Sequence, residues 1–89
     1  MFKVSEAVAI SFHAMIYIAN REDKVIPLKE IAGKFNISEH HLSKVMQRLS
    51  KEGYIKSVKG PKGGFSIVHE HKNITFLEIY EMMEGKIKR

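Results

Sequence analysis

The chain has 89 residues, of which 44% are hydrophobic and 28% are charged, and this balance indicates one small globular domain rather than a disordered chain. It contains no cysteine, which excludes disulfides, thiol catalysis and thiolate-bound zinc or iron–sulfur centres within this sequence. Lys and Arg number 15 against 10 Asp and Glu, and the net charge of +5 favours a polyanionic partner such as nucleic acid, with solubility alone as the competing explanation.

The first predicted helix begins after Ser5, a good capping residue, and runs to about Asn20. It is apolar on nearly every side, so we expect it to be buried on more than one face, one of which could meet a second chain. Helical spacing is followed by Val8, Phe12, Met15, Ile16 and Ala19, while Ile10, Ala14, Tyr17 and Ile18 lie on other faces. The apolar run after Lys3 imitates a secretory signal, but Glu6 and His13 interrupt it, and it is shorter than the roughly 18 residues of a membrane span. The sequence therefore predicts a cytoplasmic protein without membrane contact.

Two short helices joined by a tight turn come next, and each has a single apolar stripe. The first follows Pro27 and buries Leu28, Ile31, Ala32 and Phe35. The second is capped by Ser38, ends at Gly53 and buries Leu42, Val45, Met46 and Leu49. The pair predicts a helix-turn-helix in which helix 38–52 is the reader. The polar face of that reader helix consists of Glu39, His40, Ser43, Lys44, Gln47, Arg48 and Lys51, with His41 at its edge.

A β-hairpin is predicted directly after the reader helix. Two β-prone runs, residues 54–59 and 65–68, flank the loop Gly60-Pro61-Lys62-Gly63-Gly64. A hairpin in this position is a wing, and its tip carries Lys59 and Lys62 among glycines, so that its backbone can approach a surface closely.

A capping box formed by Thr75 and Glu78 begins a last helix, which ends at Gly85. The predicted fold class is therefore mainly α with a small β-hairpin, a winged helix-turn-helix. We expect residues 1–85 to form the DNA-binding domain and residues 86–89 to form a basic tail.

The positive charge is concentrated on the reader helix and the wing. Residues 38–64 contain six Lys or Arg and two Glu, a net of +4, while the other residues share +1. A winged helix presents these two elements to a duplex, so the pattern predicts double-stranded DNA as the partner. The alternatives are a winged-helix module that binds protein or RNA without reading bases, and a merely solvated surface.

Catalysis and metal binding have no support in the residue spacing. No P-loop, nucleophile elbow or triad is present, so we expect no enzyme. His40 and His41 diverge on a helix, whereas His69 and His71 could share one face of a strand. With no further ligand in reach we expect a surface loop there, and no metal or other cofactor in this chain.

The stretch from Val58 to Phe65 resembles the wing signature of the Rrf-two family of bacterial transcription regulators, the group that contains IscR, NsrR and CymR. Leu28-Lys29-Glu30-Ile31-Ala32 with Ile37-Ser38 is similar to the family's helix-turn-helix opening, and Ile74-Thr75 with Glu84-Gly85 is similar to its next helix. The resemblance implies a sequence-specific DNA-binding regulator, usually a repressor, that binds a palindromic operator as a homodimer.

The resemblance also implies where the DNA lies, with helix 38–52 in the major groove and wing 54–68 at the minor groove. Lys59 replaces the arginine that commonly enters the minor groove. The family usually continues with a cysteine-bearing loop, which can hold an iron–sulfur cluster, and with a long dimerisation helix. The homodimer is therefore expected to use the first helix and the short C-terminal region. The predicted DNA-binding residues are Lys29, Ser38, His40, His41, Ser43, Lys44, Gln47, Arg48, Lys51, Lys59, Gly60, Lys62 and Gly63.

Overall fold

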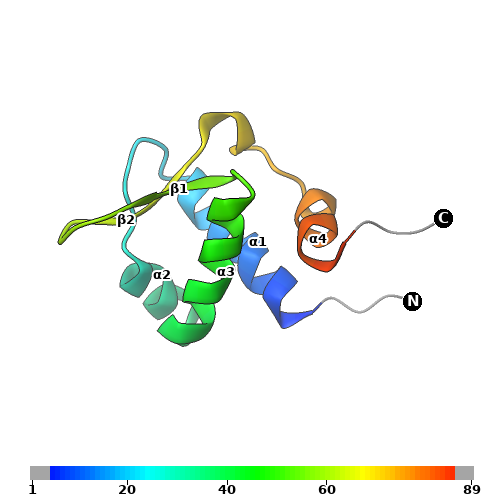
Figure 1. Ribbon diagram of the computed structural model, residues 1–89, viewed down its shortest axis with the longest axis horizontal. Coiled ribbons are helices and arrows are strands. Elements are labelled where there is room, and N and C mark those ends of the chain that lie inside the picture. The colour runs from blue at the N-terminus through cyan, green and yellow to red at the C-terminus, as the bar shows by residue number, and fades with distance from the viewer. Residues whose placement is uncertain (1–4, 86–89) are drawn as a thin grey trace.

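Helices and one hairpin make up the fold of residues 5–85, which are the residues described by the structure, a computed structural model. The elements follow in the order α1 (Glu6–Ala19), α2 (Leu28–Phe35), α3 (Glu39–Lys51), β1 (Ile55–Val58), β2 (Gly64–Ile67), the 3-10 turn η1 (His69–His71) and α4 (Phe76–Glu84). The hairpin projects from the end of the molecule opposite α4 (Figure 1). The predicted winged helix-turn-helix is confirmed. The predicted tail at 86–89 lies outside the described residues.

Helix α1 crosses the centre of the molecule and is buried on two sides. Its first turn is capped as predicted, because the Ser5 hydroxyl accepts the Val8 N–H at 3.1 Å. Among the apolar residues at helical spacing, Ile16 is exposed, with an exposed fraction of 43%. A helix that is apolar nearly all round has little periodicity to show which faces are covered. The buried residues are Val8, Ile10, Ser11, Ala14, Met15 and Ile18.

Helices α2 and α3 form the predicted helix-turn-helix. Asn36, in the left-handed conformation with φ 55°, ends α2, whereas Gly33 lies inside that helix. The Ser38 hydroxyl then caps α3 by accepting the His41 N–H at 3.0 Å. The predicted inward stripe of α3 is confirmed in full, because its buried residues are Leu42, Val45, Met46 and Leu49.

The hairpin is antiparallel and runs from the pair Ile55 and Ile67 to the pair Val58 and Gly64. Strand β1 is shorter than the predicted run 54–59, whereas β2 has the predicted length but begins one residue earlier. The prediction also missed a third partner of the hairpin. Ile26, just before α2, exchanges two backbone hydrogen bonds with Phe65, at 2.7 and 2.9 Å. This bridge fastens β2, next to the tip loop of the wing, to the segment that leads into the helix-turn-helix.

Helix α4 begins with the predicted capping box, because the Thr75 hydroxyl accepts the Glu78 N–H at 3.1 Å and the Glu78 carboxylate accepts the Thr75 N–H at 2.9 Å. It packs against α1, where the rings of Phe12 and Phe76 meet edge to face with centroids 5.0 Å apart. The buried Ile79 joins α4 to the core that α1, α2, α3 and the hairpin share.

Candidate nucleic-acid interface

A groove of about 450 Å³ separates the outer face of α3 from the wing. Its α3 wall carries Ser43, Gln47 and Lys51, which stand above one another because they are spaced four residues apart. The Gln47 side-chain amide donates a hydrogen bond to the Ser43 hydroxyl at 3.4 Å. The opposite wall includes Lys59 of the wing, so polar and cationic side chains from two elements face one space.

The groove also contains three residues that the sequence prediction omitted: Ser50, Ser57 and Phe65. A helical signal could have identified Ser50, because it lies three residues after Gln47 and seven after Ser43. Ser57 and Phe65 are paired across the hairpin, and only the register of β1 and β2 shows that they reach the groove.

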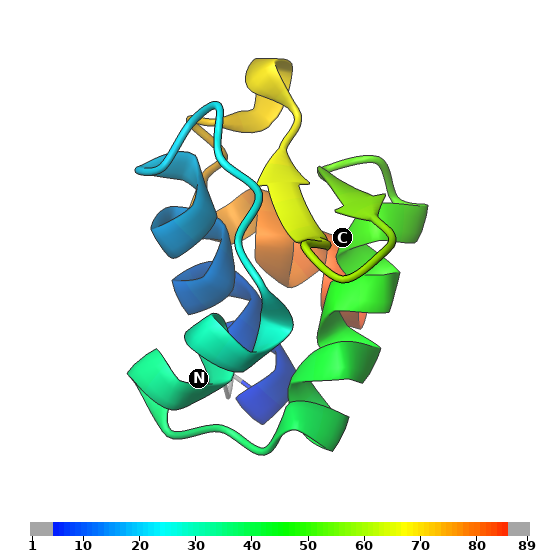
Figure 2. The ribbon, with the colours of Figure 1, turned by 90° about the vertical axis from the view of Figure 1, so that its left-hand side faces the viewer.

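The wing tip extends past α3 and presents the remaining predicted wing residues. Gly63 donates its backbone N–H to the Gly60 carbonyl at 2.9 Å, which closes a tight loop between the strands. Lys59, just before this turn, and Lys62, within it, are both exposed. In Figure 2 the loop faces the viewer, beside α3 and above α2, so the tip and the two helices share one side of the molecule.

The start of the reader helix carries the remaining predicted contacts on that side. Ser38 is exposed, and its hydroxyl is already the cap of α3. His40 is exposed, as is Lys29 in the first turn of α2. His41 is half-buried instead, and its Nδ1 lies 3.9 Å from a carboxylate oxygen of Glu6.

Arg48 is directed away from the groove. Its Nη2 donates to the Met82 carbonyl of α4 at 2.8 Å, and its Nε donates to the Glu52 carboxylate at 3.3 Å. The structure therefore brings Ser43, Gln47, Lys51 and Lys59 together and does not bring Arg48 to them. Another hollow of about 290 Å³ is lined by Ala7, His41, Lys44, Val45, Arg48 and Met83.

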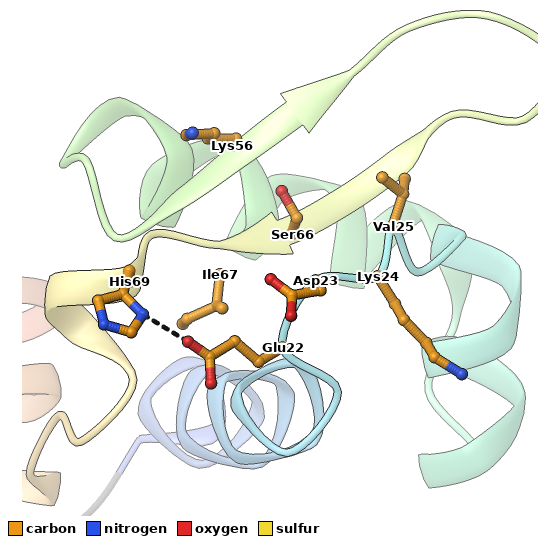
Figure 3. Close-up of a pocket in the computed structure, with 8 residues that line it drawn as sticks. All are labelled: Glu22, Asp23, Lys24, Val25, Lys56, Ser66, Ile67 and His69. Atoms are coloured by element: carbon orange, nitrogen blue, oxygen red, sulfur yellow. Dashed lines mark hydrogen bonds and ion pairs between the residues drawn. The ribbon is translucent and has the colours of Figure 1, made fainter.

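A third hollow, of about 300 Å³, lies at the base of the wing (Figure 3). The carboxylate of Glu22, in the turn after α1, is bonded to Nδ1 of His69 and lies 3.5 Å from Nζ of Lys72. The hydrogen bond from His69, aided by the charge of Lys72, lowers the pKa of Glu22 below its usual value. His69 and His71 lie in the 3-10 turn η1 and not in a strand. These contacts tie the α1–α2 turn to the end of the wing.

Neither a membrane span nor a metal centre is found in the part of the chain that the structure covers. Between residues 5 and 85, no helix combines the length and the hydropathy that a membrane crossing requires. Within the same range, no group of three or more His, Cys, Asp or Glu is arranged so that it could hold a metal ion.

Several solved structures share this fold. The structure of CymR, the global cysteine regulator of B. subtilis, superimposes with a TM-score of 0.88 at 33% identity, over 98% of this chain and 68% of that one. IscR of T. potens superimposes with a TM-score of 0.82 at 31% identity, over 99% of this chain and 65% of that one.

Curated relatives are named as HTH-type transcriptional regulators. A protein of Aquifex aeolicus named as an HTH-type transcriptional regulator is 41% identical over 84 residues, which are 94% of this chain and 58% of that protein. The HTH-type transcriptional regulator NsrR of Shouchella clausii is 30% identical over 79 residues, which are 88% of this chain and 53% of that protein. The chain thus spans little more than half the length of these relatives.

The family model Rrf2, described as an iron-dependent transcriptional regulator, matches residues 4–89. The residues present here do not fit an iron centre, because the sequence has no cysteine and the described residues offer no cluster of other ligands. The match nevertheless extends over almost the whole chain, including the reader helix and the wing. This chain therefore belongs to the Rrf2 family of transcriptional regulators, the Rrf-two family that its sequence resembles.

Proposed function

We propose that this chain is the DNA-binding part of a transcription regulator and reads duplex DNA with α3 in the major groove and the wing at the minor groove. The observation that carries the proposal is the groove of about 450 Å³ in which Ser43, Gln47 and Lys51 face Lys59. Hydrogen-bonding side chains on a helix can read base edges, while cations around them contact phosphates. The net charge of +4 over residues 38–64 supports the same orientation.

The proposed contacts divide into two kinds. Base edges are read by Ser38, His40, Ser43 and Gln47, whose side chains are polar and lie along the outer side of α3. Phosphates are contacted by exposed lysines, with the half-buried His41 beside them, and the glycines of the wing allow its backbone to approach the duplex. The proposed phosphate and backbone contacts are Lys29, His41, Lys44, Lys51, Lys59, Gly60, Lys62 and Gly63.

The proposed regulator represses transcription from a palindromic operator in the bacterial cytoplasm and acts as a homodimer. Residues 1–85 form its DNA-binding domain, and the basic residues 86–89 extend it. The outer side of α1 supports pairing, because Ile16 there is 43% exposed. Leu77 on α4 is 55% exposed, so apolar side chains of both helices remain open to a partner.

Selection from a random duplex pool, followed by titration at several salt concentrations, tests the proposal. The chain should enrich one palindromic sequence and bind it more tightly than a scrambled duplex by a factor of about 10³ or more. The logarithm of affinity should fall linearly with the logarithm of salt concentration. Indifference to duplex DNA, combined with binding to RNA or to a protein, would instead support the interaction module.

A further inference from the structure

Arg48 lies on the reader helix but is bonded to a different helix. Its guanidinium donates to the Met82 carbonyl at 2.8 Å and to the Glu52 carboxylate at 3.3 Å. Glu52 caps the end of α3, so it holds the guanidinium from the same helix, one turn further along. The planar fork of arginine can make both bonds at once, which a single ammonium group cannot do in the same geometry.

The Met82 carbonyl is a favourable acceptor for a cation. It is one of the last four carbonyls of α4, which no N–H group of that helix can reach. The C-terminal end of a helix carries partial negative charge, and a charged donor there makes a stronger hydrogen bond than a neutral one. Arg48 therefore supplies the hydrogen-bond donor that this carbonyl lacks within α4, three residues before the helix ends at Gly85.

Two hollows border the contact between α3 and α4. One side of the Arg48 bridge has the hollow of about 290 Å³ lined by Lys44 and Met83 among others. The other side has a hollow of about 250 Å³ between the end of α3 and α4, lined by Glu52, Tyr54, Glu78, Glu81 and Met82. Such hollows remove packing contacts, so the relative position of the two helices depends more on a directed bond.

We propose that Arg48 is a positioning residue that couples the C-terminal end of α4 to the orientation of the reader helix. A displacement of the end of α4 pulls on the guanidinium, which moves α3 relative to the wing and changes the width of the groove. This inference rests on the proposed DNA binding, and it assigns Arg48 to that coupling rather than to a phosphate contact.

Arg48→Ala tests the assignment against Lys51→Ala, a matched change on the groove side of the same helix. Arg48→Ala should lower affinity for the selected palindrome by about 3- to 30-fold, the range for residues that couple sites. It should leave affinity for a scrambled duplex and the salt slope unchanged. Lys51→Ala should weaken binding to both duplexes and reduce the salt slope by about one unit. Arg48→Lys, which keeps one donor, should restore part of the preference for the palindrome.

A second measurement does not depend on DNA binding. In hydrogen exchange, Arg48→Ala should speed amide exchange both in the last turn of α4 and along α3, whereas Lys51→Ala should speed neither. A loss of salt slope in Arg48→Ala, or an unchanged preference for the palindrome, would overturn the inference. If the unmodified chain ignores duplex DNA, the proposed function fails, and unchanged exchange in α3 of Arg48→Ala would then reject the coupling separately.

Discussion

Gln47 carries an amide that offers a donor and an acceptor together on the groove side of α3. Its bond to Ser43 limits the directions in which the amide can turn. An amide can pair with N6 and N7 of adenine, so Gln47→Ala should cost about 1–3 kcal/mol of specific binding and relax the preference at one base position. Titration of the selected duplex and of its single-base variants measures this. Equal losses on specific and scrambled duplexes would show that Gln47 contacts only the DNA backbone.

Glu22 should make the stability of the protein depend on pH in the acid range. Because its pKa is lowered in the folded state, mainly by the bond from His69, the Glu22 contribution is full above the ordinary glutamate pKa. This stabilising contribution is lost as the pH falls from the ordinary glutamate pKa, about 4.3, through the lowered pKa of Glu22 in the folded protein. Urea unfolding at several pH values should show a smaller acid loss for Glu22→Gln than for the unmodified chain. Glu70→Gln, in the neighbouring turn η1, controls for removal of one surface carboxylate, and parallel curves for all three proteins would contradict the expectation.

At the scale of elements, the attachment of the wing depends on one glycine. A Cβ at Gly64 would lie 2.2 Å from the Ile26 carbonyl oxygen, so Gly64→Ala must disrupt the bridge between Ile26 and Phe65. We expect a loss of about 1–3 kcal/mol in the free energy of unfolding, the usual cost of overpacking. Gly33→Ala is the control, because a Cβ inside α2 there meets nothing within 4 Å. It should instead stabilise the protein by about 1 kcal/mol, as Ala favours a helix over Gly. Denaturant unfolding measures the free energy of unfolding of both variants.

The wing should contribute affinity rather than sequence preference through its two lysines. Each phosphate contact releases counterions, so the double change Lys59→Ala with Lys62→Ala should lower the salt slope by about two units and weaken binding to every duplex. Salt titrations on the selected and the scrambled duplex measure both effects. Lys56→Ala, near the base of β1, removes one lysine away from the wing tip, and it should lower the slope by less than half of the effect of the double substitution. A slope unchanged by the double substitution would mean that the wing points away from the DNA.

The sequence predicted those elements best whose chemistry is local. The stripe of α3 and the capping box of α4 depend on residues within a few positions of each other, and both are confirmed. Prediction was poorer where burial or contacts depend on segments that are far apart in the sequence. Ile16 is exposed although its spacing fits a core stripe, because a second apolar side of α1 is the one that other elements cover. The contact of Ile26 with Phe65 and the turn of Arg48 toward α4 follow from packing that no local pattern records.

At the scale of the whole molecule, a reader of palindromes needs a second copy. The exposed apolar side chains Ile16 and Leu77 lie on α1 and α4. We expect a weak homodimer that binds one half-site poorly and a two-fold site cooperatively, because the second half-site is then bound intramolecularly. Sedimentation over a wide concentration range, with and without the palindromic duplex, measures this. Ile16→Glu should weaken pairing, with Val25→Glu as the control, since Val25 is similarly exposed at 40% but lies near the wing. A strict monomer that binds half-sites and full sites equally well would refute the expectation.

The bridge between Ile26 and Phe65 also bears on the order in which parts of the molecule fold. A two-stranded hairpin alone is only marginally stable in water. The bridge adds Ile26 as a third partner, and α2 and α3 separate Ile26 from the hairpin along the chain. Helices close short loops, whereas the bridge must close a long one and is therefore formed late. During synthesis the residues of α2 and α3 are added before Phe65. The nascent chain therefore contains its reader helix before it contains the second strand of its wing.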